Sequence, residues 1–277
     1  MKDANFLNTE FATKVFEVMQ ERDYMTVFID NIRLYKRNIP STKPQDRDYV
    51  NALMARSDLL DLCSNFTQMK FIIFTNLEDT PIDDQIRVPD NVLCISAVNA
   101  IAYGDKVIPA PYGVQRRMNQ SDDRIEKLID SMEYVPSNPR GLLYVSHNES
   151  SNAKRLGIKS LFYDKDWAEV NEQRVPYNVF LYNLSASKFM ICPVGNAIDC
   201  HRNWEVIYMR RVPVMTRDPY LEELYKDYPV LFVDDYSQVT KELLIENDDL
   251  FQRAQTMDIS GLTLPTFFDR IVEKALK

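Results

Sequence analysis

Histidine, arginine and glutamate stand close together in the short stretch HRNWE, at His201, Arg202 and Glu205. The polar loop PVGNAIDC precedes it, and the apolar spacing after it predicts that a helix begins at His201. The first turn of a helix offers unpaired N–H groups and a partial positive charge to an anion. His201 and Arg202 add donors there, and Glu205, about one turn further on, would accept hydrogen bonds from a vicinal diol. This spacing predicts a site for a diphosphate beside a ribose.

An ordinary capped helix with solvated polar side chains would explain the same spacing. The wider segment SKFMICPVGNAIDCHRNWEVIYMRRVPVM (187–215) is more specific. It resembles the signature of exostosin-type glycosyltransferases, approximately S-K-F-x-x-x-P-x-G-N-x-x-D-x-H-R-x-W-E followed by P-V. The matching residues are Ser187, Lys188, Phe189, Pro193, Gly195, Asn196, Asp199, His201, Arg202, Trp204, Glu205, Pro213 and Val214. A weaker resemblance extends over residues 140–245, and the first part of the chain matches no family that we can name.

The resemblance implies a glycosyltransferase of the GT-B type, in which two Rossmann-like α/β domains face a cleft. The C-terminal domain of such an enzyme holds a nucleotide sugar, here expected to be a UDP-sugar, and the N-terminal domain holds the acceptor. No metal or other cofactor is expected. The chain departs from the family pattern at Val194 and Ala197, and at Arg210 and Arg211, where a small residue and a glycine or cysteine are common. These departures leave the donor sugar open.

The resemblance also implies roles for single residues. Glu205 binds the ribose, and we expect it to be exposed in the cleft. The residues given to the diphosphate are Arg155, Arg202, Gly195 and Asn196, while His201, Asn196 and Asp199 lie near the sugar or support the loop.

A catalytic base has to reach the acceptor hydroxyl, which calls for a carboxylate or a histidine at the cleft. Asp30 ends the strand-like run YMTVFID, and Asp79 follows the run KFIIFTN. Asp30 and His201 are therefore the catalytic candidates, with Asp79 as a second carboxylate. A helix cap or a turn is the alternative role for each aspartate.

A basic cluster follows the first predicted strand, in the stretch NIRLYKRNIPSTKPQDR. Its members are Arg33, Lys36, Arg37, Lys43 and Arg47, and Arg116 and Arg117 could extend it. As acceptor-binding residues we single out Arg33, Lys36, Arg37 and Arg116. They would hold an anionic acceptor, either DNA with hydroxymethylated bases or an acidic glycan. A solvated loop is the alternative.

Two D-x-D triplets, Asp46–Asp48 and Asp164–Asp166, allow a different enzyme class. A metal-dependent GT-A glycosyltransferase uses such a pair to hold a divalent ion on the donor diphosphate. A non-catalytic module that binds a sugar nucleotide is the third alternative.

The elements that must position these residues alternate along the chain. Strands are predicted at 24–30, 70–76, 91–99, 141–148, 187–193, 212–215 and 229–235, and helices at 9–21, 48–66, 122–132, 201–209 and 219–227. This alternation is typical of α/β proteins with parallel sheets. The stretch 107–123, rich in proline and polar residues, is predicted to link two domains. We expect an acceptor-side domain at 1–116, a donor-binding domain at 117–260, and a helix at 261–277 that crosses back to the first domain or packs on its own.

Composition excludes several classes. The chain has 277 residues, 45% hydrophobic and 27% charged, which are globular values. Neither a signal peptide nor an apolar run of about 18 residues is visible, so we expect a cytoplasmic protein without membrane insertion. A net charge of −8 excludes a uniformly basic nucleic-acid binder.

The two histidines exclude a His-rich metal site, and the six glycines form no dinucleotide or Walker motif. The four cysteines are expected to be reduced and buried.

Overall fold

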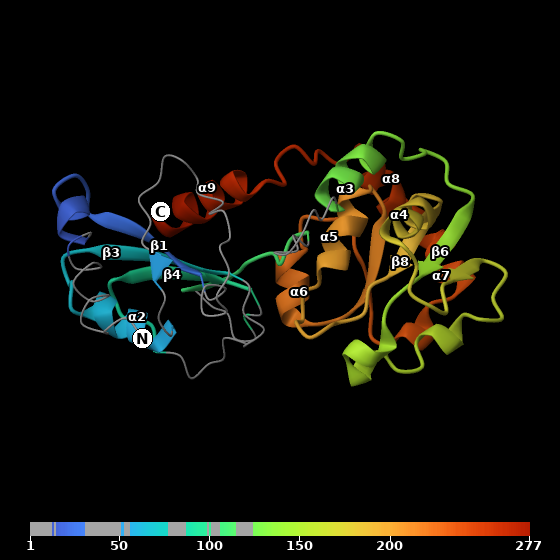
Figure 1. The fold of residues 1–277 in the computed structure, drawn as a ribbon, viewed down its shortest axis with the longest axis horizontal. Coiled ribbons are helices and arrows are strands. Elements are labelled where there is room, and N and C mark those ends of the chain that lie inside the picture. Colours follow the sequence, from blue (N-terminus) through green and yellow to red (C-terminus); the bar gives the residue numbers. More distant parts are fainter. Residues whose placement is uncertain are drawn as a thin grey trace. The chain divides into compact units, whose positions relative to one another are not determined.

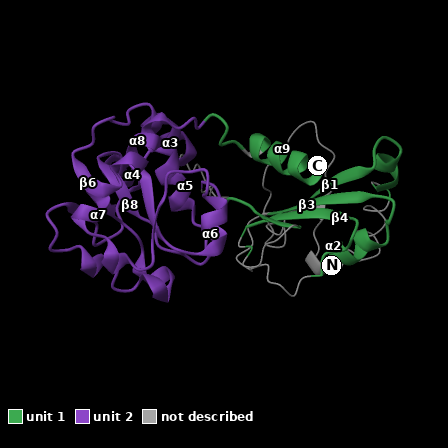
Figure 2. Cartoon of the chain, turned by 180° about the vertical axis from the view of Figure 1, so that it is seen from behind, with its two compact units in different colours: residues 1–111, 260–277 green, residues 112–259 purple. Residues whose placement is uncertain are grey.

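The computed structural model of the chain describes residues 13, 15–30, 51–52, 56–76, 87–98, 100, 106–114 and 124–277. The chain divides into two compact units (Figure 2). Unit 1 contains Met1–Pro111 and Ser260–Lys277, and unit 2 contains Tyr112–Ile259. Each unit is built on a parallel sheet of five strands with helices around it, which confirms the predicted α/β class. In the described part of the chain, none of the helices is long and apolar enough to cross a membrane.

The sheet of unit 1 has the strand order β2-β1-β3-β4-β5. The strands are β1 (Tyr24–Asp30), β2 (Asn51–Ala52), β3 (Lys70–Asn76), β4 (Val92–Ala97) and β5 (Val107–Pro109). The apolar run of β3 is buried throughout from Phe71 to Phe74, as expected for a central strand covered on both faces.

Two sequence predictions are corrected in this unit. Residues 107–109 were expected in the linker but form the edge strand β5, because Val107 and Ile108 are buried and Pro109 ends the strand, where its missing N–H costs nothing. Residues 51–52, expected in a helix, form the edge strand β2 instead.

Helix α9 (Leu264–Ala275) brings the end of the chain onto the sheet of unit 1. Its Ile271 packs in one cluster with Ile72 and Phe74 of β3, and the rings of Phe268 and Phe74 lie 4.7 Å apart. Helix α2 (Arg56–Ser64) lies on the other side of the sheet (Figure 1). Both faces of the central strand are thereby covered.

The sheet of unit 2 has the order β10-β9-β8-β6-β7. The strands are β6 (Gly141–Val145), β7 (Ala168–Val170), β8 (Ser187–Ile191), β9 (Val212–Thr216) and β10 (Leu231–Val233). Counted from the first strand of each unit, both sheets have the order 2-1-3-4-5. In such doubly wound sheets, ligands bind at the carboxyl ends of the strands where the order reverses, which here lies between β6 and β8.

Side-chain alternation along the strands sorts the helices of unit 2 into two layers. Leu143, Val145 and Phe189 point into one cluster, which α7 (Lys241–Glu246) and α8 (Asp248–Thr256) cover. Tyr144 points the other way and meets Phe180. The remaining helices are α3 (Arg124–Met132), α4 (Tyr177–Ser185), α5 (His201–Tyr208) and α6 (Pro219–Leu224).

Candidate functional site at the carboxyl edge of unit 2

Two loops and one helix meet where the strand order of unit 2 reverses. Residues 146–155 follow β6 and contain the short helical turns Glu149–Ser151 and Ala153–Arg155. Residues 192–200 follow β8 and lead into α5, whose N-cap residue Cys200 makes no side-chain capping bond. The helix therefore begins at the carboxyl edge of the sheet without a side-chain cap, and the N–H of Asn203 in its first turn bonds to the carbonyl of Cys200.

Arg155 binds the second loop through its guanidinium. Its Nε donates to the carbonyl of Val194 at 2.6 Å and its Nη2 to the carbonyl of Pro193 at 2.8 Å. Nη1 donates to Ser151 Oγ at 2.8 Å, and weaker contacts reach Asn148 O and Cys200 Sγ. These contacts use the five N–H donors of the side chain. The geometry gives Arg155 the role of shaping the loop, and the diphosphate contact expected from the sequence stays a prediction.

Gly195 lets this loop close tightly on Arg155. A Cβ atom at this position would lie 2.9 Å from Cys200 Sγ and 3.1 Å from Arg155 Nη2. The carbonyl of Gly195 also accepts a hydrogen bond from the side chain of Asn152. The next residue, Asn196, is exposed at the turn of the loop. Of the two predicted loop residues, Gly195 therefore has a packing role, while Asn196 faces solvent.

Asp199 is fully buried and holds the loop to the rest of unit 2. Its carboxylate accepts hydrogen bonds from the backbone N–H of Tyr112 and from Trp204 Nε1, both at 2.7 Å. Further donors are Cys200 N, Asn203 Nδ2 and the hydroxyl of Tyr225. Burial raises the pKa of Asp199, and these donors counteract that shift by stabilising the anion. Of the two roles left open for Asp199, the geometry favours support of the loop.

His201 contacts the segment that enters unit 2. Its Nδ1 lies 2.6 Å from the carbonyl oxygen of Gly113, and its ring lies 4.4 Å from that of Tyr112. Because a carbonyl only accepts, Nδ1 carries the proton in this contact. Gly113 has a φ of +66°, a conformation that favours glycine. His201 therefore anchors this turn.

Arg202 differs from its neighbours because it donates no hydrogen bond within the described residues. It lies half-buried at the second position of α5, with its guanidinium carbon 5.6 Å from the ring of Phe180. Its Nε is buried without a partner. A desolvated donor that lacks an acceptor is costly, so this arrangement favours an anionic ligand.

His147 was not singled out from the sequence, although it follows β6 directly. It is 5% exposed, and neither ring nitrogen has a hydrogen-bond partner in the described part of the chain. Burial, with the neighbouring charges of Arg202, Arg155 and Lys159, lowers its pKa to about 3. His147 is therefore neutral at physiological pH. Its place at the carboxyl end of a predicted strand is the signal that could have identified it.

Glu205 is 5% exposed, which corrects the expectation that it lies exposed in a cleft. The hydroxyl of Tyr177 at the start of α4 donates to its Oε1 at 3.0 Å. Burial raises the pKa of Glu205, while Arg202, the Tyr177 hydroxyl and Arg124 favour its anion. Arg124 also stacks over the ring of Tyr177, 4.5 Å from its centre. Nothing in the sequence connects Tyr177 or Arg124 with Glu205.

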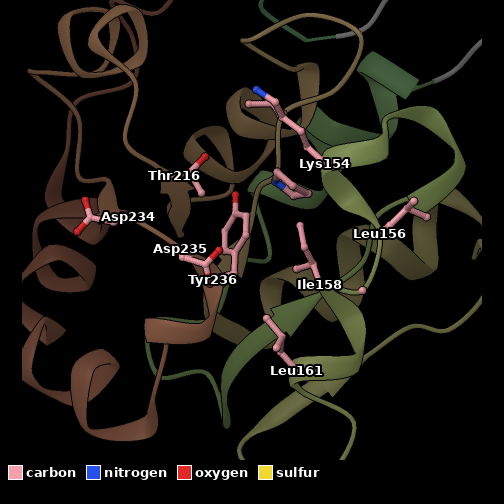
Figure 3. A pocket seen from close by; sticks show the side chains of 11 residues that line it. Lys154, Leu156, Ile158, Leu161, Thr216, Asp234, Asp235 and Tyr236 are labelled. Atoms are coloured by element: carbon pink, nitrogen blue, oxygen red, sulfur yellow. The ribbon is translucent and has the colours of Figure 1, made fainter.

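A pocket of ≈ 550 Å³ lies at the same edge of the sheet (Figure 3). One side is apolar, with Leu156, Ile158 and Leu161 from the segment after β6. The other side is polar, with Thr216 and Asp234 from the ends of β9 and β10. Pro193 and Val194, the residues that Arg155 holds, also line it, so the same loop shapes this pocket.

Other predicted residues do not join this site. Asp164 and Asp166 precede β7 and therefore lie at the amino edge of the sheet, where Asp164 pairs with Lys165 at 3.0 Å. Within the described ranges, no cluster of three or more histidine, cysteine or acidic side chains could hold a metal ion. Asp30 ends β1. Its side chain lies outside the described residues, as do Arg33, Lys36, Arg37, Lys43, Asp46, Arg47, Asp48, Asp79, Arg116 and Arg117.

No model of a known protein family matches the chain, and no curated protein matches it.

Proposed function

We propose that this chain is a glycosyltransferase of the GT-B type, which transfers a sugar from a nucleotide-sugar donor to an acceptor hydroxyl. The observation that carries the proposal is the pairing of Arg202, a guanidinium without a hydrogen-bond partner among the described residues, with the carboxylate of Glu205 on one helix. The guanidinium of Arg202 can bind the diphosphate of a nucleotide, and the carboxylate of Glu205 can accept hydrogen bonds from the two hydroxyls of its ribose. The resemblance of residues 187–215 to exostosin-type enzymes supports the same donor.

In this proposal the two loops do not react but hold the site in shape. Arg155 and Asp199 fix the loop after β8, so that α5 presents Arg202 and its first N–H groups to the diphosphate. Neutral His147, whose ring nitrogens have no hydrogen-bond partner in the described part of the chain, adds an N–H donor beside them. The pocket lined by Ile158 and Thr216 gives room at the same edge for a group attached to the nucleotide.

The acceptor side rests on the sequence alone. The basic cluster with Arg33, Lys36 and Arg37 would hold an anionic acceptor, either DNA with hydroxymethylated bases or an acidic glycan. Asp30 and His201 are the proposed catalytic bases.

The GT-A alternative is weakened by the position of Asp164 and Asp166 at the opposite edge of the sheet from Arg202. It makes a different prediction, because activity would be lost with a chelator and return with manganese. A binding module without turnover would bind the donor but neither hydrolyse nor transfer its sugar.

Titration calorimetry with UDP and a panel of nucleotide sugars tests the donor site. Arg202→Ala should weaken binding by about 1.5–3 kcal/mol, the usual contribution of a hydrogen bond to a charged group. Arg253→Ala is the matched control, because Arg253 is an exposed arginine on α8. If no nucleotide sugar binds the wild-type chain, or if both variants bind equally well, the proposal is wrong.

A further inference from the structure

A second hollow in unit 2 runs along α4, from Asn178, which follows the Glu205 partner Tyr177, to the amino edge of the sheet. This groove has a volume of ≈ 650 Å³. One wall comes from residues 130–140, at the end of α3 and before β6, and the other from α4 with Asn178, Tyr182 and Ser185. Its volume falls within the range of small-molecule binding sites.

Two tyrosine rings line this groove and are unusually exposed. Tyr134 is 80% exposed and Tyr182 is 73% exposed. A tyrosine combines a large apolar face with a polar hydroxyl, so rings left this open in the free protein are suited to covering a ligand that is itself partly polar.

A buried arginine fixes the two walls of the groove. Arg211 is fully buried, and its Nη2 donates to the carbonyl of Pro136 in one wall at 2.8 Å and to that of Ser185 in the other at 2.6 Å. Its guanidinium lies 5.5 Å from the ring of Phe251 beneath. The groove is therefore held open in a defined shape, which lowers the entropy lost on binding. Arg211 is also one of the departures from the exostosin-type pattern, so that pattern does not predict this groove.

We propose that this groove binds a neutral oligosaccharide. A pyranose ring has an apolar face of C–H groups, which would pack on the rings of Tyr134 and Tyr182, and an edge of hydroxyls. Polar side chains that can bond those hydroxyls line the groove: Asp130, Ser131, Asn138, Arg140 and Asn178. The single aspartate and the single arginine among them balance in charge, which favours a neutral ligand over an acidic one.

The proposal goes beyond the donor site and does not depend on it, since the residues of the groove that precede β6 and β8 lie at the other edge of the sheet. Its test therefore needs no nucleotide sugar.

The experiment is a titration of the full chain with cellohexaose, maltohexaose and chitohexaose, followed by NMR of tyrosine ring signals and by calorimetry. We expect at least one of them to bind with a millimolar or lower Kd. The double variant Tyr134→Ala/Tyr182→Ala should bind it at least tenfold more weakly. Tyr163→Ala is the control, because Tyr163 is 53% exposed and does not line the groove. UDP binding, measured on the same samples, should be equal in all variants.

The proposal is wrong if none of the three oligosaccharides binds at millimolar concentration, or if the double variant binds them as the wild type does. It is also wrong if sedimentation shows that the wild type self-associates and the double variant does not, because the groove would then be an interface between copies of the chain. Both tyrosines are exposed, so both variants should fold. Loss of UDP binding alone would count against the donor site and not against the groove.

Discussion

Burial of Glu205 destabilises its carboxylate anion, which is the form that would bind the ribose of the ligand. Burial raises the pKa of this carboxyl, so the folded chain holds its proton more tightly than the unfolded chain does. The free energy of unfolding therefore falls as the pH rises from the ordinary glutamate pKa, about 4.3, through the raised value. Above that window the folded state carries the full cost of a desolvated anion.

Glu205→Gln should consequently make the ligand-free chain more stable at pH 7, while weakening the binding of UDP by about 1.5–3 kcal/mol. The gain should vanish below about pH 4, where both states of the wild type are protonated. Urea unfolding at the two pH values and calorimetry measure the two effects, with exposed Glu246→Gln as the control. A variant that is less stable at pH 7 yet binds UDP normally would make Glu205 a structural residue.

Arg155 presents the opposite case, because its donors are already used within the protein. Arg155→Lys keeps the charge but cannot reach Val194, Pro193 and Ser151 together. The free energy of unfolding should therefore fall by about 2–4 kcal/mol, while the neighbouring Lys154→Ala should change it little. If Arg155 instead contacts the diphosphate directly, the lysine variant would unfold as the wild type does and lose affinity for UDP.

At the scale of elements, the turn between α5 and β9 contains an unusual backbone conformation. Arg210 has a φ of +52°, which costs about 1–2 kcal/mol for a residue with a side chain. Its Nη1 donates to the carbonyls of Gln255 and Met257 at 2.9 and 2.8 Å, and Gln255 donates back to its carbonyl. These bonds, between the turn and the end of α8, offset the strain.

Two substitutions at this turn separate the backbone from the side chain. Arg210→Ala and Arg210→Gly both lose the two bonds that Nη1 donates, but only glycine adopts a positive φ without strain. The glycine variant should therefore be more stable than the alanine variant by about 1 kcal/mol in urea unfolding. At Arg253, in the last turn of α8, the order should reverse, because glycine is the poorer helix former. Equal stability of the two Arg210 variants would mean that the turn relaxes.

Elements with a strong pattern could be predicted from the sequence, among them the short strand β10, which lies within the predicted 229–235. Strands β1 and β3 were predicted to the residue, because each is a continuous apolar run with polar ends. Edge strands β2, β5 and β7 span two or three residues, which are too few to show the alternation of apolar and polar residues that is typical of a strand. Helix α4 was missed because its tyrosines, asparagines and valine are weak helix formers, and burial of Phe180, Leu181 and Leu184 stabilises it instead.

In the candidate site, the sequence predicted the residues that are neighbours along the chain but not the contacts between distant segments. The helix that begins at His201 was predicted from spacing, because its residues are neighbours in the sequence. The partners of Asp199 were not, since they come from Tyr112, α5 and Tyr225, which only the fold brings together. The same holds for Tyr177 beside Glu205.

For the whole molecule, the distribution of charge matters more than its sum. A chain with a net charge of −8 repels a polyanion at long range, so an anionic acceptor would need a local cluster of basic residues. The sequence offers one such cluster before β2, around Lys36 and Arg37, in the part of the chain outside the described residues. Acceptor binding can therefore be tested independently of the donor site in unit 2.

Salt dependence distinguishes a charged acceptor from a neutral one. On duplex DNA, each phosphate contact contributes about −0.9 to the slope of log K against log salt, because counterions are released. Lys36→Ala/Arg37→Ala should therefore flatten the slope by about two and leave UDP affinity unchanged. Lys241→Ala/Arg253→Ala removes the same charge from exposed positions of unit 2 and should preserve the slope. Acceptor affinity at several salt concentrations gives the slopes, and equal slopes in all three proteins would mean that the cluster is a solvated loop.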